Sequence, residues 1–282
     1  MQLGFIGAGR IGRPMIGRLV AAGHQVRVLD RSEAARAAVS AAGAVTVDDL
    51  AQVAQGAEAV VLCPYSDAQV RELALDSELL HLMSPGSVLV VHTTGSPRTV
   101  GAIAERARPG GIEVVDAPIS GGPADIEAGH VTLYTGATEA GMAKAEAVLT
   151  AYADPIVHLG PPGAGQQMKL INNAVFAANI GIIAEAVRIA KRLGLDEAAV
   201  LSGLRNGSGD SRALAGAAAA GSVATFGQAV GEFVGKDVAV VNHLVDELGL
   251  DLGVLEGPHR VLADLLSPEH RALLLAHSST TG

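Results

Sequence analysis

The sequence has little cysteine, few aromatic side chains and no excess of basic charge. It contains one cysteine, Cys63, and no tryptophan, its aromatic content is 2%, and its formal net charge is −9. A single cysteine excludes a framework of internal disulfides and fits a reducing cytoplasm. Nucleic acids and anionic membranes attract basic surfaces, so the negative charge argues against both as partners. The nine histidines show no HxH or HxxxH spacing, so we predict no metal site.

The sequence also lacks the marks of export and of membrane insertion. Its start runs directly into a strand pattern, without a basic segment, a long apolar stretch and a cleavage site. We find no apolar run of the roughly 20 residues that span a bilayer. These observations predict a cytoplasmic protein that does not bind membranes.

What the sequence has is length and apolar residues in alternating patterns. The 282 residues, 49% of them hydrophobic, are enough for two domains. Short apolar runs alternate with helical patterns over the first 160 residues, which predicts an α/β doubly wound, mainly parallel sheet of the Rossmann type. The expected strands are Leu3–Gly7, Gln25–Asp30, Ala44–Val47, Ala59–Leu62, Ser87–Val91, Ile112–Asp116, Val131–Thr135 and Ile156–His158. From residue 164 onward the pattern is helical, so we expect domains at 1–161 and 162–282, the second all-α.

A glycine-rich loop follows the first expected strand. The sequence Gly7-Ala-Gly-Arg-Ile-Gly12 opens a helical pattern, and Asp30 ends the next strand 18 residues later. Glycines here permit a tight turn and a close approach to a pyrophosphate, which the positive end of the helix attracts. The residues expected to hold the dinucleotide at this loop are Gly7, Gly9, Arg10, Ile11 and Gly12.

The sequence gives two conflicting indications of the cofactor. Asp30 can accept a hydrogen bond from a ribose 2′-hydroxyl and would repel a 2′-phosphate, which favours NAD. Arg31 and Ser32 are residue types that bind a 2′-phosphate, which favours NADP. The carboxylate favours NAD slightly, and both cofactors stay open.

Two further motifs carry groups suited to a small-molecule substrate. Asp116-Ala-Pro-Ile-Ser-Gly-Gly122 follows a strand, and its Ser120 hydroxyl and the N–H groups of Gly121 and Gly122 could bind a carboxylate. Gly163-Ala-Gly-Gln-Gln-Met-Lys-Leu-Ile-Asn-Asn173 begins a long apolar helix. It places Lys169 and Asn173 four residues apart, on one face. A buried lysine needs a partner or a use, and an ammonium can exchange a proton with the oxygen of a hydroxyl or carbonyl.

The chain resembles the β-hydroxyacid dehydrogenase family, which includes 3-hydroxyisobutyrate dehydrogenase and tartronate semialdehyde reductase. Four blocks carry the resemblance in the family's order: Gly7–Met15, Asp116–Gly122, Gly163–Asn173 and Gly235–Asp237. The resemblance implies a Rossmann-type domain joined by a long central helix to an all-α domain, and a homodimer or higher homo-oligomer.

The resemblance also implies roles for individual residues. Lys169 would be the catalytic acid and base, in a cleft between the domains, and Lys236 would close over the cofactor. Ser120, Gly121, Gly122 and Asn173 would bind a small carboxylate substrate, and Leu62, Cys63, Pro64 and Thr94 would lie near the nicotinamide. The chain departs from the family at His92-Thr-Thr94, where Asp-x-Ser-Thr is usual. The region Asn206–Gly227, expected to line the substrate pocket, is poor in large side chains.

These expectations predict an NAD(P)-dependent oxidoreductase that interconverts a small β-hydroxyacid and its semialdehyde or keto form. Two alternatives stay open: an imine reductase or reductive aminase on the same scaffold, and a non-catalytic NAD(P)-binding protein used in assembly or sensing. Relatives that reduce imines tend to replace the lysine, and non-catalytic ones lose it, so Lys169 argues against both.

Overall fold

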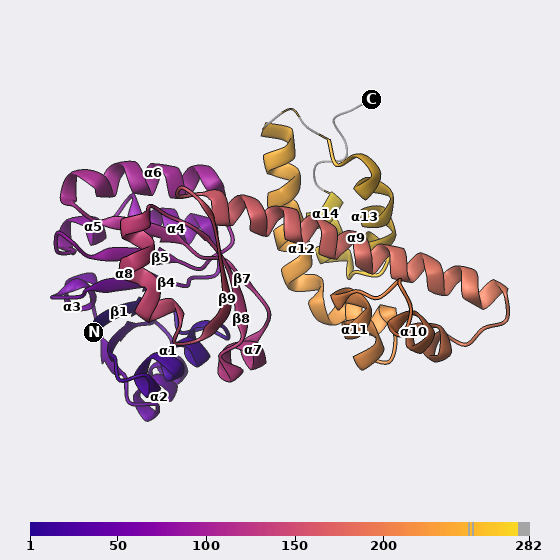
Figure 1. Cartoon of the computed structure of the whole chain (residues 1–282), viewed down its shortest axis with the longest axis horizontal. Coiled ribbons are helices and arrows are strands. Elements are labelled where there is room, and N and C mark those ends of the chain that lie inside the picture. The colour runs from indigo at the N-terminus through magenta and orange to yellow at the C-terminus, as the bar shows by residue number, and fades with distance from the viewer. Residues whose placement is uncertain (248, 250, 276–282) are drawn as a thin grey trace. The chain divides into compact units, whose positions relative to one another are not determined.

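The computed structural model describes residues 1–247, 249 and 251–275. The chain divides into two compact units, Met1–Lys169 and Leu170–Gly282 (Figure 1). The division falls inside one continuous helix, α9 (Ala164–Arg192). The apolar pattern of residues 231–248 predicts Leu248 on a helix stripe, and the sequence after His270 predicts a loosely held tail. Leu248 and residues 276–282 of that tail lie outside the described residues.

The first unit contains a single sheet of nine strands. The strands are β1 (Gln2–Ile6), β2 (Gln25–Leu29), β3 (Val45–Val47), β4 (Ala59–Leu62), β5 (Val88–Val91), β6 (Glu113–Asp116), β7 (Ile119–Ser120), β8 (Val131–Gly136) and β9 (Ala153–Gly160). Their order is β3-β2-β1-β4-β5-β6-β8-β7, with β9 paired to β8. The six neighbouring strands β3, β2, β1, β4, β5 and β6 are parallel to one another, whereas β8 runs antiparallel to β6 and β7. The predicted doubly wound fold is confirmed.

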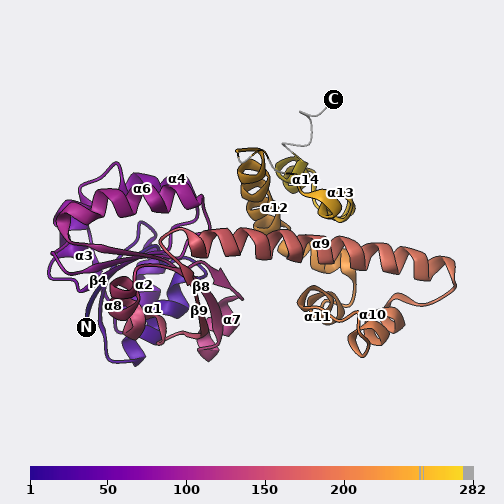
Figure 2. The same ribbon diagram turned by 45° about the horizontal axis from the view of Figure 1, so that its top comes forward.

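Helices cover both faces of this sheet (Figure 2). They are α1 (Gly12–Ala21), α2 (Glu33–Ala41), α3 (Leu50–Ala54), α4 (Asp67–Ala74), α5 (Leu79–Leu82), α6 (Pro97–Ala107), α7 (Pro123–Ala128) and α8 (Glu139–Leu149). One buried cluster joins alternate strand residues to α1, α2, α7 and α8. The other joins the remaining strand residues to α3, α4, α5 and α6. Successive strand residues point to opposite faces, so both faces need an apolar cover, as in parallel sheets.

The second unit is all-α, as expected. Besides the greater part of α9 it contains α10 (Glu197–Arg205), α11 (Arg212–Ala219), α12 (Val223–Glu247), α13 (Glu256–Ala263) and α14 (Pro268–Leu275). Figures 1 and 2 show α10 and α11 on one side of α9, and α13 and α14 on the other. The core contains Ile180, Ile183 and Val187 of α9 together with residues of the other helices.

Two helices of the second unit have bounds that differ from those the sequence pattern predicts. The alanine run at 217–220 forms most of the last turn of α11, where Ala217 is buried. The apolar pattern predicts a helix from Gly231, but α12 starts eight residues earlier, at Val223. Alanine is the strongest helix former, so a run of alanines extends a helix more readily than it interrupts one.

Helix α9 also corrects the expectation that no stretch could span a membrane. By length and composition alone, α9 is long and apolar enough to cross a membrane, with a mean hydropathy of 1.5 over 18 residues. Half of that window is buried inside the protein. The core helix of a soluble protein passes the same test, so this is weak evidence for a membrane span.

Candidate active site

The glycine loop has the tight geometry that its sequence predicts. Gly7 has a φ of 101°, and a Cβ on it would lie 2.5 Å from the Cys63 carbonyl oxygen. A Cβ on Gly12 would lie 2.0 Å from the Gly7 carbonyl oxygen. By contrast, a Cβ on Gly9 would meet no atom of the described chain within 4 Å. Gly7 and Gly12 are therefore required by the fold itself, whereas Gly9 leaves open space of the kind a dinucleotide would fill.

The start of α1 fits the phosphate role of this loop. Within residues 1–247, no side chain caps the helix at Ile11, and its first turn has no acidic residue. The first N–H groups of a helix, together with its dipole, then form a site for an anion. The residues present therefore fit a dinucleotide pyrophosphate.

Asp30 is fixed against the glycine loop. Its Oδ2 accepts a hydrogen bond from Ala8 N at 2.7 Å, and its Oδ1 accepts one from Ser32 N at 2.8 Å. Ser32 also caps α2, since its hydroxyl accepts from Ala35 N. The Arg31 side chain is 96% exposed and lies 4.0 Å from Glu72. The carboxylate is thus held at the end of β2, while the arginine extends into solvent.

The loops after β4 and β5 are joined to each other and to α9. The Thr93 hydroxyl donates to the Pro64 carbonyl oxygen at 2.7 Å. The Gln166 side chain accepts from Gly95 N at 3.0 Å and donates to the Thr93 carbonyl oxygen at 2.8 Å. Gln166 therefore bonds to the residues on both sides of Thr94, which we had expected near the nicotinamide. We did not predict this role, although Gln166 lies in the motif that starts α9.

The start of α9 is anchored by a buried carboxylate, Asp116, at the end of β6. It accepts hydrogen bonds from Gly163 N at 2.6 Å and Gln166 N at 2.7 Å. Burial raises the pKa of Asp116 to about 6, and these N–H donors oppose the rise. A Cβ on Gly165 would lie 2.4 Å from the Tyr134 carbonyl oxygen, so α9 packs on the strand ends without room for a side chain.

Lys169 lies four residues after Gly165, on the same face of α9. It is only 9% exposed. Lysine is almost never this buried without a partner or a function. The hydrogen bonds of Asp116 and Gln166 fix the turn of α9 just before Lys169. The result is a buried lysine one turn after Gln166, which bonds to the residues on both sides of Thr94.

The Ser120–Gly122 turn begins with β7, where Ser120 pairs with Thr132 of β8. Gly121 has a φ of 137°, which requires glycine. Gly122 N donates to Asp125 Oδ2 at 2.7 Å. The Gly122 amide, which we expected to bind substrate, is therefore already bonded to a carboxylate of the chain.

His92, in the stretch where the chain departs from the family's usual Asp-x-Ser-Thr, forms two buried hydrogen bonds. Its Nδ1 lies 2.6 Å from the Ala117 carbonyl oxygen and its Nε2 lies 2.7 Å from the Tyr152 hydroxyl. Because a carbonyl can only accept, Nδ1 carries the proton and the tyrosine donates to Nε2. Burial lowers the pKa of His92 to about 4, so the ring is neutral at pH 7. His92 thus joins the end of β5 to the end of β6 through Ala117, and to the start of β9 through Tyr152.

In the second unit, Asn173 is part of a polar group with α12. Its Nδ2 donates to Asp237 Oδ2 at 2.7 Å, and its Oδ1 accepts from Asn172 Nδ2 at 3.2 Å. Lys236 Nζ lies 3.7 Å from Asp237 Oδ1. We had expected a role for Lys236 but none for Asp237, the next residue in the same motif.

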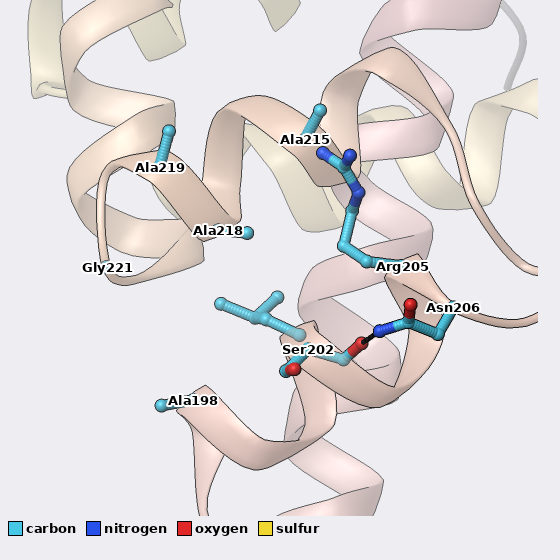
Figure 3. Close-up of a pocket in the computed structure, with 9 residues that line it drawn as sticks. Ala198, Ser202, Arg205, Asn206, Ala215, Ala218, Ala219 and Gly221 are labelled. Atoms are coloured by element: carbon cyan, nitrogen blue, oxygen red, sulfur yellow. Dashed lines mark hydrogen bonds between the residues drawn. The ribbon is translucent and has the colours of Figure 1, made fainter.

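The second unit also has a pocket of about 480 Å³ between α10 and α11 (Figure 3). Arg205 and Asn206 stand at one side of it, opposite alanines of α11. Its lining residues are Ala198, Leu201, Ser202, Arg205, Asn206, Ala215, Ala218, Ala219 and Gly221. Five of these lie in the region 206–227 that we expected to line a substrate pocket, but none is a predicted catalytic residue.

Family models match both parts of the chain. The NAD binding domain of 6-phosphogluconate dehydrogenase matches residues 2–160. The NAD-binding family of NADP-dependent 3-hydroxyisobutyrate dehydrogenase matches residues 163–271.

Individual proteins give the same result. A Pseudomonas aeruginosa NAD-dependent L-serine dehydrogenase is 34% identical over 76% of this chain and 72% of its own length. The 3-hydroxyisobutyrate dehydrogenase of that organism is 33% identical over the same shares. The structure of Mycobacterium tuberculosis 3-hydroxyisobutyrate dehydrogenase with L-serine has a TM-score of 0.86 and 25% identity, and the match covers 98% of both chains. The chain belongs to the β-hydroxyacid dehydrogenase family and is an NAD(P)-dependent oxidoreductase that acts on CH–OH groups.

Proposed function

We propose that the protein interconverts a small β-hydroxyacid and its semialdehyde or keto form, with Lys169 as the general acid and base. The observation that carries this proposal is the burial of Lys169 in a segment of α9 that Asp116 and Gln166 tie to the strand-end loops. A buried ammonium beside a substrate hydroxyl has few other uses.

The chemistry divides between the cofactor and the chain. A bound nicotinamide would supply the hydride acceptor for oxidation of the carbinol carbon and the hydride donor for the reverse reduction. Lys169 in its neutral form takes the hydroxyl proton as the C–O bond becomes a carbonyl, and its ammonium form gives the proton back in the reverse direction. Hydride and proton together account for the two hydrogen atoms that the substrate loses.

We assign substrate binding to Ser120, Gly121, Gly122 and Asn173. The Ser120 hydroxyl and the Gly121 N–H can donate to an anionic oxygen. Gly122 can contribute fully only when its bond to Asp125 is broken or shared. Asn173, four residues after Lys169 on the same helix, orients the substrate through its amide, which Asp237 holds in place.

We propose NAD as the preferred cofactor, bound by Gly7, Gly9, Arg10, Ile11 and Gly12, with the nicotinamide near Leu62, Cys63, Pro64 and Thr94 and with Lys236 closing over it. The reason for the preference is Asp30. Its carboxylate is held by two backbone N–H groups, so it cannot turn away from a 2′-phosphate without losing both bonds. Arg31 and Ser32 border the same position, but the Arg31 side chain is directed into solvent near Glu72, and Ser32 binds Asp30 only through its backbone N–H.

We propose that the protein is a homodimer in the cytoplasm. The support is a row of exposed apolar side chains along α9: Ile171, Val175, Ile182, Ile189 and Leu193, which are 46% to 72% exposed. Val175, Ile182 and Ile189 are seven residues apart, which is the spacing of a helix seam that packs against another helix.

The test is a spectrophotometric screen of small hydroxyacids and aldehydes, with NAD(H) and NADP(H) run in parallel and cyclic imines included. We expect turnover of hydroxyacids and semialdehydes, and loss of that turnover in Lys169→Ala. Turnover of imines alone, or cofactor binding without turnover of any compound, would refute the proposal.

A further inference from the structure

The side chain of Gln166 is a buried amide with a partner at each end. It is the third residue of α9 and is 1% exposed. Its oxygen accepts from Gly95 N at 3.0 Å, and its nitrogen donates to the Thr93 carbonyl oxygen at 2.8 Å. Because one end of an amide only accepts and the other only donates, a single orientation satisfies both partners. The side chain therefore holds the backbone in place both before and after Thr94.

Thr94 differs from its two neighbours in burial. Thr93 and Gly95 are buried, whereas Thr94 is partly exposed. Both bonds of the Gln166 amide go to backbone atoms of the neighbours, so they do not use the Thr94 side chain. The Thr93 hydroxyl donates to the Pro64 carbonyl oxygen at 2.7 Å, which fixes the same segment to the loop after β4. The segment is thus held from two sides while it presents Thr94.

The backbone of Gln166 belongs to the turn of α9 that leads to Lys169. Its N–H donates to Asp116 Oδ2 at 2.7 Å, at the end of β6. Lys169 follows three residues later, and residues at this spacing are neighbours on a helix surface. With a rise of about 1.5 Å per residue, the two lie about 4.5 Å apart along the helix axis. Gln166 therefore joins the backbone around Thr94 to the turn that carries Lys169.

We propose that Gln166 is a positioning residue for the oxidoreduction. Its amide sets the distance between the loop of Thr94, where we place the nicotinamide, and the turn of α9 that carries Lys169. Hydride and proton leave the same carbinol group, so both transfers depend on this distance. A misplacement of about 1 Å can cost a factor of about 100 in rate. The inference rests on the proposed function, because it takes Thr94 and Lys169 as parts of the active site.

The first test uses the protein without cofactor. Gln166→Met keeps a side chain of similar length and removes both hydrogen bonds. The amide hydrogen of Gly95 should then exchange with solvent about tenfold faster than in the wild type, because its acceptor is gone. Gln167→Met makes the same change at the next position, which is exposed, and should leave this exchange unchanged. Exchange at Gly95 as slow in Gln166→Met as in the wild type would overturn the proposal.

The second test is the rate constant for nicotinamide reduction in the first turnover, measured by stopped-flow absorbance at saturating cofactor and substrate. The substrate is the one that the wild type oxidises fastest among 3-hydroxypropionate, 3-hydroxybutyrate, glycerate and serine. In Gln166→Met this rate constant should fall by about 10- to 100-fold. In Gln167→Met it should equal the wild-type value. If Gln166→Met does not fold, Gln166→Glu keeps an acceptor for Gly95 N without the donor to Thr93, and should show a fall in the same range.

The same measurement separates positioning from a purely structural role. Unfolded molecules do not react, so a loss of folded protein lowers the amplitude of the first turnover and leaves its rate constant unchanged. An unchanged rate constant in the Gln166 variant would overturn this inference alone, since the wild type still transfers hydride. No reduction of nicotinamide by the wild type with any of the four acids would refute the proposed function, and this inference with it.

Discussion

Asn173 Nδ2 donates a 2.7 Å hydrogen bond to Asp237 Oδ2. The two residues are 64 positions apart and come from α9 and α12. Both are largely buried, so the amide has a fixed orientation. A substrate-orienting amide works only if its donor and acceptor ends do not exchange places, and an ionised acceptor at one end ensures this.

Removing the Asp237 carboxylate should therefore impair Asn173. We expect Asp237→Ala to lower kcat/KM by about 10- to 100-fold, which corresponds to a hydrogen bond of about 1.5–3 kcal/mol to a charged group. Asp237→Asn should recover part of the loss, because its amide oxygen can still accept. Steady-state kinetics test this, with Asp264→Ala as control, since Asp264 forms an exposed ion pair with Arg271. Equal kinetics in Asp237→Ala and the control would show that the bond has no functional role.

Gly9 and Gly12 should respond differently to alanine. Gly9→Ala meets no atom of the described chain within 4 Å, so it should keep the wild-type melting temperature. It should nevertheless weaken NAD binding by about tenfold, because its methyl group enters the space of the pyrophosphate. Gly12→Ala meets the Gly7 carbonyl oxygen at 2.0 Å and should destabilise the fold by about 1–3 kcal/mol. Thermal melts and NAD titrations, with Gly17→Ala as control, separate the two effects. Unchanged NAD affinity in Gly9→Ala would count against a dinucleotide at this loop.

The charge of Asp30 should set the cofactor preference. We expect the wild type to have a higher kcat/KM with NAD than with NADP. Asp30→Asn keeps an oxygen for Ala8 N but removes the charge that repels a 2′-phosphate. The ratio of kcat/KM with NAD to kcat/KM with NADP should therefore fall by about 10- to 100-fold, which corresponds to about 1.4–2.7 kcal/mol. Asp48→Asn, at a carboxylate paired with Arg36 on the surface, is the matched control. A wild-type preference for NADP would show that Arg31 and Ser32 dominate instead.

The buried His92 should make stability depend on pH. Its folded pKa of about 4 lies below the unfolded value of 6.5, so the unfolded chain binds the proton first as pH falls. The stabilisation is complete above pH 6.5 and is lost between pH 6.5 and 4, by about 3 kcal/mol at most. Asp116 opposes this trend because its pKa is raised in the folded state. Its contribution to the free energy of unfolding falls as pH rises from 3.8 to about 6.

The measurement is therefore a difference between two proteins that both keep Asp116. Denaturant unfolding of the wild type and His92→Gln at pH 7.0, 5.5 and 4.5 should show the advantage of the wild type shrinking as pH falls. A difference in unfolding free energy that stays constant with pH would show that His92 is not held neutral in the folded state.

Much of the first unit could be predicted because its signals are local. The strands are short apolar runs, and Ser32, Ser66, Ser96 and Thr138 cap the helices that follow them. The tight glycine loop at Gly7 and Gly12 follows from residue type and spacing.

What the sequence did not predict depends on contacts between distant residues. The bonds of Gln166 to Thr93 and Gly95 span more than 70 positions, and no local pattern indicates them. The same holds for His92 and Tyr152, which are 60 positions apart. The bond between Gly122 and Asp125 is local, and the spacing of an N-cap residue and an acidic N3 residue could have indicated it.

The central claim is that Lys169 moves the proton, and its most direct measurement is the turnover of Lys169→Ala on the hydroxyacid that the wild type oxidises best. We predict a fall in kcat of about 10²- to 10⁴-fold, with an unchanged NAD dissociation constant. The control, Lys191→Ala, removes an exposed lysine of the same helix that pairs with Glu197, and should keep full turnover. Full turnover by Lys169→Ala with normal NAD affinity would contradict the mechanism.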